Sequence, residues 1–243
     1  MIRKILSILA TVLVVLSCGA LVGFSWEEES NAQYAGLEVD VEEIDGMFFV
    51  DAAAVREVIL ARDSVSGTFV ADLPLGEVTR WIREIPAVED VQVYPGLNRT
   101  LHVSVSQRKP LARLHHPTDQ PDAYIDSNGE LLPLSTQYTA RVPVIHAKNR
   151  ADAEEAFALV QATCNHAVWS AFIDQIEVRS DGGLDVIPRI GGARIHFGTT
   201  DQLDEKLNKL LVFYREQIAR GNLNAYKRID LEFQDQVVAE RYY

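Results

Sequence analysis

The stretch from Ile85 to Leu114 constrains the fold most, because it combines a helix end, two strands and a turn. Apolar residues fall on every second position around Val91–Val93 and again over Leu101–Val105, which is the period of a half-buried strand. Between these runs Pro95–Asn98 has turn chemistry, so we expect an antiparallel hairpin. Pro86 ends a preceding helical pattern. The stretch carries no catalytic chemistry, which favours a binding role.

One strand and two helices are predicted upstream of this hairpin. Residues 37–44 alternate between apolar and acidic side chains, which indicates a first strand. Helical spacing follows over 52–61, where Asp51 has the side chain of an N-cap. The helical spacing of apolar residues recurs at Val78 and Ile82, which predicts a second helix. The predicted order is therefore β-α-α-β-β.

This order and two motifs resemble a POTRA domain. The motifs are Ile-Pro-x-Val-x-x-Val-x-Val-x-Pro-Gly at 85–96 and Leu-x-Val-x-Val-x-x-Arg-x-Pro-Leu-Ala at 101–112. The exit over Arg108–Ala112 is similar to that of the FtsQ/DivIB family of bacterial cell-division proteins. In that family a POTRA domain follows a single membrane anchor and precedes a second, β-rich domain.

The second half of the chain fits the same resemblance. Tyr124–Leu132 resembles the family's strand-turn-strand element. Helices are predicted over 153–168 and from Thr199 to Gly221, where Thr199 and Gln202 have capping-box spacing. Two closing strands are expected over the ranges 226–233 and 237–243.

The N-terminal segment predicts a membrane anchor. An uncharged apolar run extends from Ile5 to Trp26, which is long enough to cross a bilayer as a helix. Arg3 and Lys4 precede the run and Glu27 follows it, so the positive-inside rule places the N-terminus in the cytoplasm. The bulk of the chain is then periplasmic.

Two other interpretations of this segment remain open. One is a cleaved signal peptide, although the apolar run continues without a clear cleavage site. The other is a lipoprotein, in which Val15–Cys18 would act as a lipobox and Cys18 would be lipidated. We prefer the retained anchor, because the residues after Cys18 remain apolar.

The predicted fold class is α+β, with a single N-terminal transmembrane helix, a POTRA domain and a mixed β-rich domain that contains two helices. The predicted domains are a cytoplasmic tail at 1–4, the transmembrane helix at 5–25, a tether at 26–36, the POTRA domain at 37–110 and the C-terminal domain at 111–243.

Charge and composition exclude several functions. The formal net charge of −12 repels phosphate backbones, so nucleic acid is not an expected partner. His115 and His116 lie near Asp119 and Asp122, but no second cluster has metal-ligand spacing. No Ser or Cys lies in a nucleophile motif. Cys164 is predicted to be a small buried apolar residue. We predict no metal, no cofactor and no enzymatic activity.

Strand addition is the predicted binding chemistry. The chain ends in β-structure, and a last strand at a sheet edge can pair with an extended partner segment. The resemblance implies small single-pass coiled-coil division proteins of the FtsB/FtsL type as partners. Alternatively, the apolar residues of this region belong to the core of the domain and the last residues of the chain are frayed. The candidate partner-binding residues are Leu231, Phe233, Val237, Val238, Glu240, Arg241, Tyr242 and Tyr243.

The resemblance implies a bitopic scaffold in the inner membrane, which links divisome components at the division septum. One alternative is a POTRA module of an outer-membrane assembly or secretion system, although the long series of barrel strands is missing. Another is a lipidated or membrane-anchored enzyme of the cell envelope, which would need a reactive set of residues that we do not find.

Overall fold

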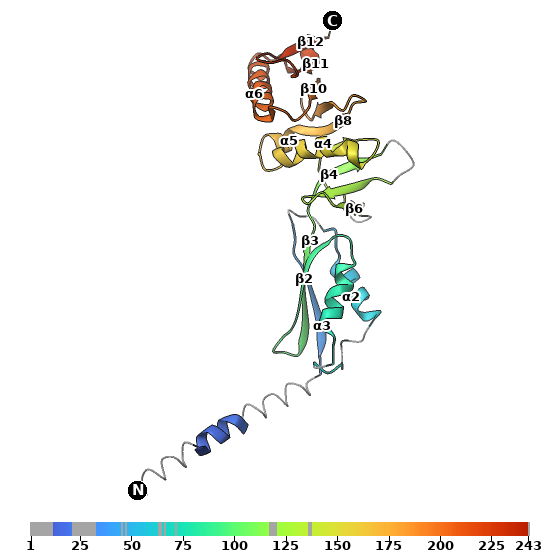
Figure 1. Cartoon of the computed structure of the whole chain (residues 1–243), viewed down its shortest axis with the longest axis vertical. Coiled ribbons are helices and arrows are strands. Elements are labelled where there is room, and N and C mark those ends of the chain that lie inside the picture. Colours follow the sequence, from blue (N-terminus) through green and yellow to red (C-terminus); the bar gives the residue numbers. More distant parts are fainter. Residues whose placement is uncertain are drawn as a thin grey trace, which may run out of the picture. The chain divides into compact units, whose positions relative to one another are not determined.

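A computed structural model of the chain forms two compact units, unit 1 (Met1–Gln107) and unit 2 (Arg108–Tyr243) (Figure 1). Each unit has its own hydrophobic core. The predicted domain boundary, between residues 110 and 111, falls just after the boundary between the units. The residues that the structure describes are 12–20, 33–44, 46, 48–62, 65, 67–70, 72–116, 121–135 and 138–242.

The predicted anchor over 5–25 extends beyond the described residues on both sides. Residues 12–20 are helical, and the Ser17 hydroxyl donates to the carbonyl of Val14 at 3.0 Å. Among the described residues we find no helix that combines the length and the hydropathy of a membrane span. The transmembrane helix stays a prediction, as does the tail at 1–4, which lies outside the described residues.

After the helical residues 12–20, the described part of unit 1 contains a three-stranded sheet and two helices, in the predicted order β-α-α-β-β. Strand β3 is central in the sheet order β1-β3-β2, parallel to β1 and antiparallel to β2. The hairpin is thereby confirmed, whereas the name POTRA stays a prediction. The elements are β1 Gly36–Val41, α2 Ala52–Leu60, α3 Leu75–Arg83, β2 Val88–Pro95 and β3 Thr100–Gln107.

Local sequence accounts for much of unit 1. The Asp51 carboxylate accepts a hydrogen bond from the Ala53 amide at 2.9 Å, so the predicted N-cap of α2 is confirmed. The buried faces of α2 and α3 pack against alternate residues of β3, which are completely or almost completely buried. At the end of β3, the buried side chain of Gln107 bonds to the amides of Phe49 and Val50 and to the carbonyl of Glu42.

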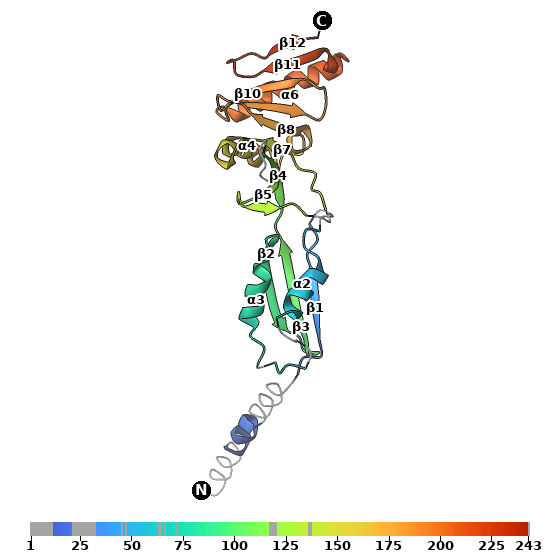
Figure 2. The ribbon, with the colours of Figure 1, turned by 90° about the vertical axis from the view of Figure 1, so that its right-hand side faces the viewer.

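Unit 2 is built on one sheet, in which nine strands are described. Strands from distant parts of the sequence lie side by side in it (Figure 2). The strands are β4 Pro110–His115, β5 Ala123–Asp126, β6 Leu131–Pro133, β7 Val144–His146, β8 Ile173–Val178, β9 Leu184–Pro188, β10 Arg194–Gly198, β11 Tyr226–Asp230 and β12 Val238–Arg241. The sheet order is β12-β11-β10-β9-β8-β7-β4-β5-β6.

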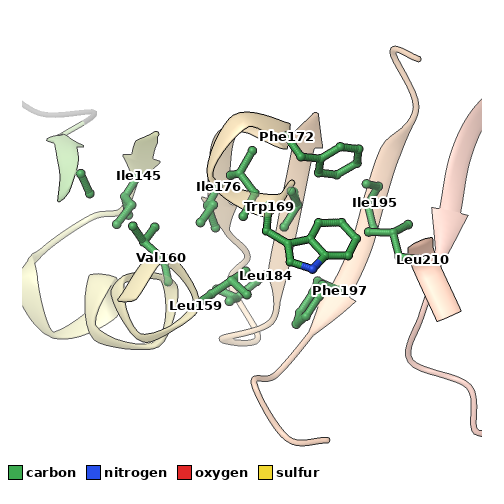
Figure 3. Close-up of a cluster of buried hydrophobic side chains, with 14 of the residues drawn as sticks. Ile145, Leu159, Val160, Trp169, Phe172, Ile176, Leu184, Ile195, Phe197 and Leu210 are labelled. Carbon is green, nitrogen blue, oxygen red and sulfur yellow. The ribbon is translucent and has the colours of Figure 1, made fainter. Parts of the chain in front are cut away.

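The two faces of this sheet differ in character because side chains alternate along each strand. One row across the strands, from Leu114 through Ile145, Ile176 and Ile195 to Ile229, is apolar and buried. The helices pack their own apolar side chains into the same core (Figure 3). The neighbouring row is polar and consists of His115, His146, Glu177, Asp185, His196 and Asp230.

Both predicted helices of unit 2 are present. Helix α4 (Arg150–Thr163) begins earlier than predicted, because Asn149 caps it by accepting from the Asp152 amide at 2.9 Å. Helix α6 (Leu203–Ala219) begins later than predicted. A short helix α5 (Trp169–Phe172) and a 3-10 turn, η1 (Leu223–Ala225), were not predicted.

The predicted capping box at the start of α6 is wrong. Gln202 occupies the N-cap position in a left-handed conformation with φ 54°, and no side chain caps the helix. The Thr199 hydroxyl instead bonds to the carboxylate of Asp201 at 3.0 Å. The Thr200 amide donates to Glu155 of α4 at 2.6 Å, so a long-range contact determines how the chain enters α6.

Candidate partner-binding edge

Strand β12 is the last strand at one edge of the sheet in unit 2, in the part of the chain that the structure describes. It pairs antiparallel with β11, and β11 pairs in parallel with β10. An edge strand presents unpaired backbone N–H and C=O groups along its outer side. These groups are what a partner strand requires.

Several contacts attach the C-terminal segment to η1 and β11. The Tyr242 amide donates to the carbonyl of Ala225 at 3.0 Å, so pairing continues beyond β12 itself. The Arg241 guanidinium lies over the ring of Tyr226, 5.2 Å from its centroid, and donates to the Tyr226 hydroxyl at 3.2 Å. An ion pair of 2.6 Å joins Lys227 to Glu240. The edge is therefore formed by an ordered strand.

The Tyr242 contact also determines which donors face outward. Successive residues of a strand direct their N–H groups to opposite sides. Because the Tyr242 N–H donates to Ala225, the residue directly before β11, the N–H groups of Ala239 and Arg241 point away from β11. A partner strand would pair with these two donors.

The structure places Val238, Glu240, Arg241 and Tyr242 at this edge, whereas Phe233 lies in the turn before β12. Leu231 is completely buried in the core of unit 2, so we leave its side chain out of the proposed surface. Tyr243 lies outside the described residues. Val237 is partly buried against the core. The exposed members are Phe233, Val238, Glu240, Arg241 and Tyr242, and Tyr242 is 61% exposed.

The turn that leads into β12 is held by residues that sequence reasoning missed. Arg179, which follows β8, places its Nη2 atom 2.6 Å from Oε1 of Glu232. On α6, the ammonium of Lys209 donates to the carbonyl of Phe233 at 2.9 Å. The only sequence signal was their charge, because these partners lie far from the turn in the sequence.

Arg179 is the centre of a larger polar cluster. Its guanidinium also bonds to Asp181 at 3.2 Å and lies 2.9 Å from Nδ1 of His196. Burial by itself would lower the pKa of Arg179, but the hydrogen bonds to Glu232 and Asp181 outweigh it and raise the pKa. The guanidinium is therefore charged at any physiological pH and holds the turn continuously.

Of the two neighbouring histidines, His115 pairs with a carboxylate as part of a salt-bridge cluster. His115 Nδ1 lies 2.9 Å from the Asp122 carboxylate, which also accepts two hydrogen bonds from Arg113. Burial alone would raise the pKa of Asp122, but the hydrogen bonds with Arg113 and His115 outweigh it and lower the pKa. His116 is buried, and Asp119 lies outside the described residues.

Within the described ranges, no three or more His, Cys, Asp or Glu side chains gather as metal ligands. That the protein needs no metal, no cofactor and no catalytic residues stays a prediction. The geometry at β12 is suited to binding an extended segment through the backbone.

Comparison with known proteins identifies the family of this chain. The family described as "FtsQ/DivIB, C-terminal related" matches residues 109–240, which is more than half of the chain. The chain is also similar to the "Cell division protein FtsQ" of Salinibacter ruber (strain DSM 13855 / M31), with 23% identity over 234 residues. That alignment covers 90% of this chain and 85% of the relative. The chain belongs to the FtsQ/DivIB family.

Proposed function

We propose that this protein is a non-catalytic scaffold of bacterial cell division that binds its partner by strand addition at β12. Membership of the FtsQ/DivIB family and the similarity to a cell-division protein support the cellular role. The edge position of β12, with exposed Val238 and Tyr242 beside outward N–H groups, is the observation that carries the binding mode.

The proposed partners are small single-pass coiled-coil proteins of the FtsB/FtsL type. A partner strand beside β12 would accept hydrogen bonds from the outward amides of Ala239 and Arg241. Its side chains would meet Val238 and Tyr242, and Tyr is a common anchor at protein interfaces. The acidic chain makes nucleic acid an unsuitable partner.

The scaffold would be held in the inner membrane by the predicted helix over 5–25, with its N-terminus in the cytoplasm. A POTRA domain in unit 1 and a partner edge in unit 2 would then lie in the periplasm at the septum. The apolar run and its flanking charges support this placement.

A proline substitution tests the backbone contact directly. Proline has no N–H, so Ala239→Pro removes one outward donor and leaves the inward Tyr242 bond to Ala225 in place. We expect the full-length variant in detergent to lose co-purification with the small division proteins, whereas Ala239→Val retains it. Hydrogen exchange of the β11 amides would show that the sheet is intact in both.

A second pair of variants covers the case in which the proline disturbs β12. Tyr242→Ala should weaken partner capture by about tenfold or more, as expected for an interface anchor. Val212→Ala changes an exposed apolar residue of α6 and should leave capture unchanged. Undiminished capture by both Ala239→Pro and Tyr242→Ala would refute strand addition at β12. Recovery of an outer-membrane barrel protein as the partner would refute the division role.

A further inference from the structure

A small pocket in unit 2 lies apart from the β12 edge. It is formed at the start of β4, in the loop before β7, at the end of α4 and along α5. Its volume is about 130 Å³, and Leu111, Val142, Val160, Trp169 and Ile173 supply its apolar lining. No residue of β11 or β12 lines it.

The size and the apolar lining of the pocket define what fits inside. An apolar cavity of about 150 Å³ accepts benzene, so this pocket has room for one phenyl or isobutyl group. Val160, Trp169 and Ile173 are buried in the core and hold the lining in place. The pocket is therefore suited to one bulky apolar side chain.

The charges around the pocket are opposite in sign to the net charge of the chain. Lys109 and Arg141 line the pocket and are exposed, and among the described residues no Asp or Glu lines it. The chain as a whole has 35 acidic residues against 23 basic residues. Arg141 makes no hydrogen bond or ion pair with any residue that the structure describes. An exposed guanidinium without a partner attracts an anionic group.

We propose that this pocket binds an acidic protein segment, in which one bulky apolar side chain has carboxylates on both sides. The apolar side chain would enter between α4 and α5, and a neighbouring carboxylate would meet Arg141. This site is independent of strand addition at β12, so the protein presents a second partner surface.

Cys164 provides a direct reporter for occupancy of the pocket. It lines the pocket and is partly exposed, which corrects the sequence-based prediction of a buried thiol. The chain contains two cysteines, so Cys18→Ser leaves Cys164 as the single thiol. A bound segment would cover this thiol and slow its alkylation by iodoacetamide.

The experiment uses the full chain carrying Cys18→Ser and three capped peptides. The probe is Glu-Glu-Phe-Glu-Glu, and the comparison peptides replace its Phe by Ser or its four Glu by Lys. We expect only the probe to bind, measured by fluorescence anisotropy, and to slow Cys164 alkylation at least threefold at saturation. The effect should weaken with salt, because exposed charges are screened.

Substitutions at the rim test the role of charge. Arg141→Glu should weaken binding of the probe by about fivefold or more, as expected for loss of an exposed ion pair. Arg215→Glu is the matched control, since Arg215 is exposed on α6 and does not line the pocket. Hydrogen exchange in α4 would verify that each variant is folded.

Several outcomes would overturn the proposal. Binding of the Ser peptide as tightly as the Phe peptide would show that the apolar pocket is not used. Equal weakening by Arg215→Glu would show general charge attraction. Absence of probe binding at millimolar concentration, or displacement of the probe by a short single-stranded DNA at lower concentration, would exclude an acidic protein segment as the ligand. None of these results depends on whether β12 binds its own partner.

Discussion

Arg179 and Glu232 join two strands of unit 2 that are not neighbours in the sheet. The Nη2 atom of Arg179, just after β8, lies 2.6 Å from Oε1 of Glu232, just after β11. Glu232 belongs to the turn that leads into the edge strand β12. The contact therefore couples the middle of the sheet to the segment that positions the proposed partner edge.

Loss of this contact should loosen the turn. Arg179→Ala removes bonds to Glu232, Asp181 and His196, so the amides of residues 231–237 should exchange about tenfold faster. Arg179→Lys should restore part of the protection, because an ammonium keeps the charge but not the planar fork. Arg189→Ala, which removes an exposed pair with Asp174, is the control and should leave this segment unchanged.

The core of unit 2 should depend strongly on its central apolar row. Ile176 is 0% exposed, so Ile176→Ala should lower the free energy of unfolding by about 2–5 kcal/mol. Ile190 is 49% exposed, so Ile190→Ala should change the free energy of unfolding by less than about 0.5 kcal/mol. Urea unfolding followed by Trp169 fluorescence, with the other two tryptophans replaced by Phe, measures both. Equal losses would contradict the assigned core.

Gln107 should be essential to unit 1. Its Oε1 atom accepts from the amides of Phe49 and Val50 at 2.6 and 2.9 Å, and its Nε2 atom donates to the Glu42 carbonyl at 2.7 Å. Gln107→Met keeps the length of the side chain and leaves these groups without that partner, which should cost about 1–3 kcal/mol of stability. Gln92→Met on the exposed side of β2 is the control and should cost much less, with the stability of both variants measured by thermal unfolding.

The Glu177–Arg194 pair should make stability depend on pH. The hydrogen bond from Arg194 lowers the pKa of Glu177, so the folded state favours the ionised carboxyl. This contribution is present at neutral pH and disappears as the pH falls through the lowered pKa, below the ordinary glutamate value of about 4.3. Glu177→Gln should therefore be less stable than the parent at pH 7 and equal to it near pH 2.

Solvent limits the size of that difference. Glu177 is 38% exposed, so we expect less than about 1 kcal/mol at pH 7. Glu216→Gln, in an exposed pair on α6, is the matched control and should show a smaller dependence. A parent that remains more stable than Glu177→Gln at pH 2 would show that the ion pair is not the cause.

Local pattern was sufficient wherever neighbouring residues determine the structure. The alternation of Val91, Val93, Leu101, Val103 and Val105 predicted the hairpin, because the period of a strand is a property of the backbone. The Asp51 cap was predictable for the same reason, since its partner amide is two residues away. The final strand was visible too, although it is shorter than predicted.

Tertiary structure decided what depends on residues far apart in the chain. The start of α6 depends on Glu155, whose carboxylate accepts a hydrogen bond from the Thr200 amide. Arg179 contacts Glu232 only because the sheet brings the ends of β8 and β11 near each other. The burial of Leu231 and the exposure of Cys164 likewise depend on which elements pack around them. The sequence by itself determined the periods of the elements and the family resemblance. Only the tertiary structure decided the order of the sheet, the edge at β12 and the pocket beside α4 and α5. Local patterns allow many arrangements equally, and long-range burial and charge pairing select among them.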